Sequence, residues 1–211
     1  MKTLMRTLIR KLKNILVISS ILLFLAFTFS SSPPSGWYLQ TLPINDQVKD
    51  IYFTDSLKGW MITKGDINTN DTGYILHTTN GGDNWVVQFD TTNDFNKIQF
   101  IDDNLGYAVG GNGRASFMKT TSGGLNWNYN TPFGSGIYGI LDFQFINRDT
   151  GWFCTDDPFS GSVYKTSNGG ENWFRQLDQT YKIVALDFPS RDTGYAINSQ
   201  KLYKTTNSGV N

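Results

Sequence analysis

Three observations predict an all-β protein built from repeated antiparallel units. An eight-residue motif, Thr-Thr-Asn-Gly-Gly-Asp-Asn-Trp at 78–85, recurs in related form at 120–127 and 166–173, and in part at 205–211. A second motif, Phe-x5-Gly-Trp/Tyr, precedes each copy, with its Phe positions 47, 45 and 43 residues apart. No segment beyond residue 30 shows sustained helical periodicity. Four strands in a unit of about 40–45 residues predict the blade of a β-propeller.

The first motif, called the box here, has the residue types of a self-contained turn. Asn or Ser stands third, where its side chain can bond the backbone, and Gly stands fifth, where a turn needs positive φ. Trp stands eighth and supplies a large apolar anchor. These positions are Asn80, Gly82 and Trp85, then Ser122, Gly124 and Trp127, then Asn168, Gly170 and Trp173, then Asn207 and Gly209. Nothing in the box requires a ligand, so we assign it a structural role.

The apolar runs around the two motifs predict four strands in each repeat. The first strands are expected at 48–54, 97–101, 141–146 and 183–188, and the second strands at 59–63, 106–110, 151–155 and 194–198. The third are expected at 74–79, 116–121, 163–167 and 202–206, and the fourth at 85–89, 127–129 and 173–176. The polar residues between first and second strands are typical of hairpin turns. The predicted blades are therefore 48–89, 96–130, 139–176 and 183–211.

A further strand is predicted at 37–41, because Trp37 matches the Trp that opens each fourth strand. The last repeat has three strands, so this segment could close a four-bladed ring by pairing with 202–206. The alternative is a larger propeller of which these residues, 37–211, form the front part. The end of the sequence inside a box at Asn211 favours the larger propeller.

Residues 1–30 have the pattern of a secretory signal peptide. A basic start precedes an apolar run at 15–29, which is shorter than the ~20 residues of a membrane-spanning helix. An uncleaved membrane anchor is the alternative. Residues 31–36, which contain two prolines, are expected to be a linker. We therefore predict a secreted, periplasmic or cell-surface protein with no other membrane association.

Charge and cysteine content exclude several functions. Beyond residue 30 the chain has 13 basic and 18 acidic residues, which argues against nucleic acid as a partner. Cys154 is the only cysteine, so no internal disulfide can form. It lies in an apolar run, where we expect a small buried hydrophobic residue rather than a reactive thiol.

The box copies resemble the Asp-box, or bacterial neuraminidase repeat, although Asn or Ser replaces the usual Asp at the third position. Combined with Phe-x5-Gly-Trp/Tyr, they look more like photosystem II stability/assembly factor-like proteins over about residues 37–211. That resemblance implies an exported or lumenal β-propeller acting as a binding scaffold. It also implies that the box lies at the blade periphery, away from the binding face.

The residue content of the sequence gives little support for an enzymatic function. Sialidase activity would need an Arg cluster and a Tyr–Glu pair, but Glu171 is the only Glu and lies inside a box. A glycoside hydrolase needs two carboxylates flanking one bond, and the many Asp residues single out no pair. The loop at 66–73 has oxygen ligands at alternate positions, as in a calcium site, but departs from that pattern at its Gly and its final acid. We predict no catalytic, metal or cofactor residues.

The loops between second and third strands vary while the frames around them repeat, and such loops on a rigid scaffold carry binding. In propellers these loops share one face with the connections from fourth to first strands. The candidate binding residues on that face are Asp66, Asp71, Arg114, Phe133, Tyr138 and Phe159. We predict a non-enzymatic scaffold for a protein partner. The alternative is a carbohydrate-binding or sialidase-like module of a surface protein, with a glycan as its partner.

Overall fold

The computed structural model describes residues 35–65, 70–129, 136–157 and 160–210. The chain divides into two compact units, Met1–Leu39 and Gln40–Asn211. Of the first unit, residues 35–39 are described; they form no helix or strand, and Trp37 is fully exposed. The predicted strand at 37–41 is therefore not observed. An extended segment becomes a strand only where its N–H and C=O groups pair with a neighbouring strand.

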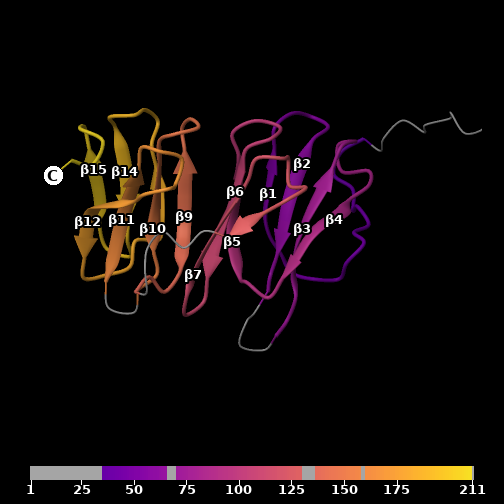
Figure 1. The fold of residues 1–211 in the computed structure, drawn as a ribbon, viewed down its shortest axis with the longest axis horizontal. Coiled ribbons are helices and arrows are strands. Elements are labelled where there is room, and N and C mark those ends of the chain that lie inside the picture. Colours follow the sequence, from indigo (N-terminus) through magenta and orange to yellow (C-terminus); the bar gives the residue numbers. More distant parts are fainter. Residues whose placement is uncertain (1–34, 66–69, 130–135, 158–159, 211) are drawn as a thin grey trace, which may run out of the picture. The chain divides into compact units, whose positions relative to one another are not determined.

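The second unit is all-β, as predicted, and every regular element described in it is a strand (Figure 1). Its strands form four antiparallel sheets in which neighbours follow chain order. We call these sheets blades 1 to 4. Blade 1 comprises β1 (Val48–Phe53), β2 (Gly59–Thr63), β3 (Gly73–Thr78) and β4 (Val86–Thr91). Blade 2 comprises β5 (Phe95–Phe100), β6 (Gly106–Gly111), β7 (Ala115–Thr120) and β8 (Asn128–Tyr129). Blade 3 comprises β9 (Ile140–Phe145), β10 (Gly151–Thr155), β11 (Gly161–Thr166) and β12 (Phe174–Gln179). Blade 4 comprises β13 (Ala185–Asp187), β14 (Gly194–Ile197) and β15 (Leu202–Thr205).

Adjacent blades contact one another through their first strands, β1, β5, β9 and β13. Side chains connect these strands in place of a backbone ladder: the Asp50 carboxylate accepts from the Ile98 N–H between blades 1 and 2, and amides make the connections between the later blades. Gln99 accepts a hydrogen bond from the Phe145 N–H at 2.8 Å and donates to the Phe145 carbonyl at 2.9 Å. Gln144 makes the same pair of bonds to Phe188. A primary amide suits this position because it both donates and accepts.

Aromatic stacking between blades forms the core. The Phe of the second motif stacks on the motif aromatic residue of the preceding blade rather than on that of its own. The ring centroids lie 3.6 Å apart for Phe100 and Trp60, 4.0 Å for Phe145 and Tyr107, and 3.8 Å for Phe188 and Trp152. The blades thus depend on their neighbours for burial, as expected for a repeat protein.

The same stacking explains why the second motif has a glycine at a fixed distance from its Phe. The Phe ring lies directly over the motif glycine of its own blade. A Cβ at Gly106 would lie 2.6 Å from the Phe100 ring, and one at Gly151 would lie 2.7 Å from the Phe145 ring. Any side chain at these glycines would displace the ring that joins two blades. The motif therefore records a packing requirement and not a ligand site.

Candidate functional site

The box folds into the self-contained turn that its residue types predict. In blade 1 the Thr78 hydroxyl accepts from the Gly82 N–H at 3.0 Å and donates to the Asn80 carboxamide oxygen at 2.9 Å. That oxygen also accepts from the Asn84 N–H at 3.0 Å. Blade 3 repeats the three bonds at the same distances, and in blade 2 Ser122 replaces the Asn with its hydroxyl. Gly81 and Gly82 have φ of 71° and 93°.

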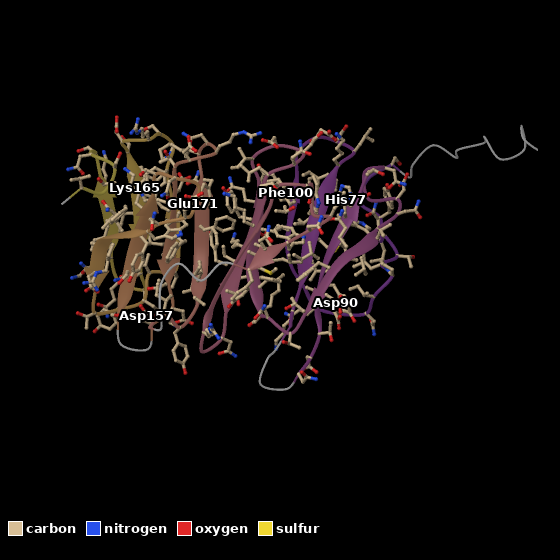
Figure 2. All side chains as sticks on the ribbon, in the orientation of Figure 1. His77, Asp90, Phe100, Asp157, Lys165 and Glu171 are labelled. Carbon is tan, nitrogen blue, oxygen red and sulfur yellow. The ribbon has the colours of Figure 1, made fainter. Side chains whose placement is uncertain are left out.

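Each box turn lies against the turn between the first two strands of its own blade. The Gly81 N–H donates to the Leu57 carbonyl at 2.8 Å, and the Gly169 N–H donates to the Asp149 carbonyl at 2.9 Å. Figure 2 shows Glu171, a box residue, and Asp157, from the β10–β11 loop, toward opposite ends of the sheets. The box side chains are therefore occupied by structural bonds at the end away from the variable loops.

The acids of these turns also have structural partners. The Asp55 carboxylate accepts from the N–H groups of Leu57 and Lys58, and these backbone bonds, that of Lys58 foremost, hold the pKa of Asp55 below its usual value. Backbone bonds from Asn104 and Leu105 lower the pKa of Asp102 in the same way. Carboxylates with depressed pKa values stay ionised, so they are poor general acids.

At the opposite end, the loops between second and third strands interlock with the connections between blades. The Gly111 N–H donates to the Asp94 carbonyl at 2.6 Å, and the Ala115 N–H donates to the Ile137 carbonyl at 3.0 Å. The Asp156 N–H donates to the Gly139 carbonyl at 2.9 Å. The first and third of these bonds lie beside the pairing of first and second strands within blades 2 and 3, and the second joins blade 2 to the connection that leads into blade 3. This end, called the loop face here, therefore has a fixed backbone frame.

The structure brings two predicted residues, Arg114 and Tyr138, together on the loop face. Both are exposed, and a Cβ at Gly113 would lie 3.9 Å from the Tyr138 ring. Among the described residues, Arg114 forms no ion pair. Arg114 also lines a pocket of about 230 Å³ together with Asn93, Asp94 and Tyr129. An exposed guanidinium and an exposed aromatic ring on the same face suit an acidic or aromatic ligand group.

Sequence reasoning missed Asp157, which fixes Tyr138 in place. Its carboxylate accepts from the Tyr138 N–H at 3.1 Å and from the Thr155 hydroxyl at 2.9 Å. The neighbouring Asp156 pairs with Lys182 at 2.9 Å. A run of two acids in a variable loop was the available signal, but only the fold shows that the loop meets Tyr138.

Asp71, another predicted binding residue, is not part of this group. Asp71 lines a separate pocket of about 420 Å³ with Asp46, Lys64 and Tyr74 in blade 1. Asp66, Phe133 and Phe159 lie outside the described residues.

Reactive groups are scarce in the described part of the chain. No group of three or more His, Cys, Asp or Glu residues there could hold a metal ion. Cys154 is a free, fully buried cysteine, and burial raises the pKa of its thiol far above the usual value. It therefore behaves as a small core residue. Within the described residues, no helix has the length and apolar character to cross a bilayer.

Fold and turns together define a β-propeller repeat protein with structural box turns. The model of the family described as photosynthesis system II assembly factor YCF48 matches residues 30–201. The chain therefore belongs to that family. A search of the curated proteins gave no match.

Solved structures share the fold. A structure described as YCF48 bound to D1 peptide is 22% identical with a TM-score of 0.55, and the match covers 81% of this chain and 58% of that one. YCF48 from Cyanidioschyzon merolae is 21% identical with a TM-score of 0.55, over 78% and 57% of the two chains. The GH74 enzyme of Niastella koreensis is 12% identical with a TM-score of 0.54, over 74% and 30%. At these identities the likeness shows the fold alone, and the chain spans less than two thirds of each YCF48 structure.

Proposed function

We propose that the chain is a non-enzymatic propeller module that binds a segment of a protein partner on its loop face. The carrying observation is that exposed Arg114 and Tyr138 lie on the same face, where the Ala115 N–H to Ile137 carbonyl bond joins the backbone segments next to them. The box end offers no comparable site, because its polar side chains are used in turns. The YCF48 structure with a D1 peptide supports a polypeptide as the ligand class.

Charge suggests which part of the partner Arg114 recognises. Lys182 is already paired with Asp156, whereas Arg114 has no acidic partner among the described residues. A carboxylate of the ligand would complete a charge-assisted bond, which contributes roughly 1.5–3 kcal/mol. Tyr138 would cover an apolar or aromatic neighbour of that carboxylate.

Fluorescence anisotropy with a labelled D1 peptide tests this proposal. Arg114→Ala and Tyr138→Ala should each weaken binding about tenfold or more, which corresponds to a loss of at least ~1.4 kcal/mol. Arg175→Ala is the matched control, because Arg175 is exposed on β12 and pairs with Asp178 away from this site. The proposal fails if the peptide does not bind, or if all three variants bind as the wild type does.

We also propose that the protein is exported, on the basis of the basic and apolar pattern in residues 1–30. The family match begins at residue 30, at the end of that pattern, which supports a separate targeting segment. Mass spectrometry of the mature N-terminus in the cell envelope fraction should find a start near residue 31. An intact Met1 in the cytoplasmic fraction would contradict export.

A further inference from the structure

The dipeptide Asn-Gly occurs three times in the chain, with its asparagines at Asn80, Asn112 and Asn168. In this dipeptide the glycine nitrogen can attack the carboxamide carbon of the asparagine, because glycine has no side chain to hinder the approach. A bond forms between that nitrogen and Cγ, and the Cγ–Nδ2 bond breaks, so that ammonia leaves with the proton of the glycine N–H. Water then opens the cyclic imide at either carbonyl and gives aspartate or isoaspartate. The reaction therefore needs a mobile carboxamide and an accessible glycine N–H.

Two of the three dipeptides lie in boxes, where both reacting groups are held. The Asn80 carboxamide oxygen accepts from the Thr78 hydroxyl at 2.9 Å and from the Asn84 N–H at 3.0 Å. The attacking nitrogen of Gly81 is held as well, because its N–H donates to a carbonyl of the neighbouring turn at 2.8 Å. The same three bonds in blade 3, at 2.9, 3.0 and 2.9 Å, hold Asn168 and the glycine after it. The box turns therefore protect their asparagines from this reaction.

The third dipeptide, Asn112-Gly113, lies at the tip of the hairpin between β6 and β7, on the loop face. Both residues are exposed, and Gly113 has φ of 87°. Among the described residues, no hydrogen bond is made by the Asn112 carboxamide or by the Gly113 N–H. The space beside Gly113 is open, since a Cβ there would meet only the Tyr138 ring, at 3.9 Å. Asn112 thus has the freedom that the box asparagines lack.

A carboxylate at position 112 would change the charge of the pocket that contains Arg114. Asn112 lines this pocket, and the charged residues of its lining are Asp94 and Arg114. One acid and one base leave the lining neutral, so a second acid would make it negative. A carboxylate two positions from Arg114 in the same short loop can also pair with its guanidinium. An acidic ligand group would then meet a repelling charge and an occupied arginine.

We propose that Asn112 is a site of spontaneous deamidation, and that the aspartate or isoaspartate formed there weakens binding of an acidic polypeptide segment on the loop face. The first half stands on the contrast between the environments of the three asparagines. The second half rests on the proposed function, because it takes Arg114 as the contact of the ligand. The reaction needs only water, so the loss of binding follows the age of the protein.

Peptide mapping of the intact chain tests the modification. The full chain is kept in mildly alkaline buffer, and trypsin then releases residues 65–97, 98–114 and 166–175 as three peptides that contain one Asn-Gly each. Tandem mass spectrometry should find the change from amide to acid at Asn112 about tenfold faster than at Asn80 or Asn168, which react only after local unfolding. Incubation in guanidinium chloride is the control, because the three asparagines should react at similar rates in the unfolded chain.

Fluorescence anisotropy with the labelled D1 peptide tests the effect on binding. Asn112→Asp should weaken binding about threefold or more relative to freshly prepared wild type. Asn126→Asp is the matched control, because Asn126 is exposed in the box of blade 2 and adds the same charge at the opposite end; it should leave the affinity unchanged. Wild type should lose affinity during the incubation. Asn112→Gln should keep its own starting affinity, since glutamine would have to close a larger ring.

Equal rates at the three asparagines of the folded chain would overturn the modification site. Equal affinities of fresh wild type and Asn112→Asp for the D1 peptide would overturn its effect on binding. If fresh wild type does not bind the D1 peptide, the proposed function fails and the effect on binding fails with it. The peptide map decides the modification in every case, so the two failures are distinguishable.

Discussion

The junction between blades 2 and 3 and the junction between blades 3 and 4 use the same strands and motifs but differ in closure. At the first, Trp173 packs on Phe117, Phe145 and Phe153, at centroid distances of 5.6, 5.9 and 4.5 Å. At the second, a cleft of about 270 Å³ lies beside Phe188 among the described residues. Phe188 still stacks on Trp152 there. The stacking of each first-strand Phe on the preceding blade therefore joins the blades. The box Trp fills the remaining space at the junction.

Replacing Trp173 by Ala should remove this packing from the junction between blades 2 and 3. Trp173→Ala should lower the free energy of unfolding by roughly 3 kcal/mol, near the lower end for large aromatic truncations because Trp173 is only half-buried. Urea unfolding followed by circular dichroism measures this. Phe174→Ala is the control, because Phe174 is 63% exposed and its loss should cost less than about 0.5 kcal/mol. Equal losses of unfolding free energy in the two variants would refute this role of Trp173 at the junction.

The box turns of blades 3 and 4 should also differ in their contribution to the free energy of unfolding, because their first threonines differ in burial. Thr166 is fully buried, and its hydroxyl accepts from the Gly170 N–H at 3.0 Å. Thr166→Val leaves that buried N–H unpaired and should cost about 1–3 kcal/mol. Thr205 is less buried, so water can replace its hydroxyl, and Thr205→Val should cost about 1 kcal/mol or less. Parallel urea titrations test this order, and a larger loss at Thr205 would contradict it.

One carboxylate, that of Asp142 on β9, contacts both junctions. It forms an ion pair with Lys97 of blade 2 at 3.8 Å, and it accepts from the Leu186 N–H of blade 4 at 3.0 Å. Burial raises the pKa of Asp142, with this bond and Lys97 opposing the shift. A folded pKa above the unfolded value gives stability that is present at low pH and is lost as pH rises through the folded pKa.

Asp142→Asn should remove that loss. The amide oxygen of the variant can still accept from the Leu186 N–H. The variant should therefore gain stability relative to wild type as pH rises from about 4 to 7, and the gain should be at most about 1.5 kcal/mol. Chemical denaturation at several pH values gives the difference between the two proteins. A difference that is constant with pH, or that favours wild type at pH 7, would show that Asp142 is not the titrating group.

The smallest expected effect on stability concerns His77, at the junction between blades 1 and 2. Lys119, Lys165 and Lys204 each lie over the second-strand aromatic ring of their blade. In blade 1, His77 takes this place over Trp60, with ring centroids 4.6 Å apart. Burial, followed by the charge of Lys58, lowers the pKa of His77, and its Nε2 is buried without a hydrogen-bond partner. The folded protein therefore favours the neutral ring.

His77→Lys should restore the cation found in the other blades. Because the folded pKa of His77 is depressed, wild type should lose stability as pH falls from about 7 through that pKa, and the variant should lack this loss. The difference at pH 7 should stay within about 1 kcal/mol, the scale of a cation–π contact. Thermal unfolding between pH 5 and 8 measures both quantities. Identical pH profiles would rule out titration at His77.

Local chemistry allowed much of the fold to be predicted. The box turns and the strand positions follow from residue types whose preferred partners lie within a few positions in the chain, such as Thr78, Asn80 and Gly82. The candidate site was predicted in part: Arg114 and Tyr138 come together on the loop face, while Asp71 lies in another pocket. The role of Asp157 was missed, because its contact with Tyr138 spans 19 positions.

The sequence by itself determined the repeat, the antiparallel blade and the structural use of the box, because short-range hydrogen bonding and side-chain alternation decide these. Only the tertiary structure decided which aromatic rings stack. The second motif places Phe100 and Tyr107 in one hairpin, seven positions apart, yet Phe100 stacks on Trp60 and Tyr107 stacks on Phe145. The physical reason is that a blade cannot bury both of its faces alone, so its apolar groups take their partners from neighbouring blades.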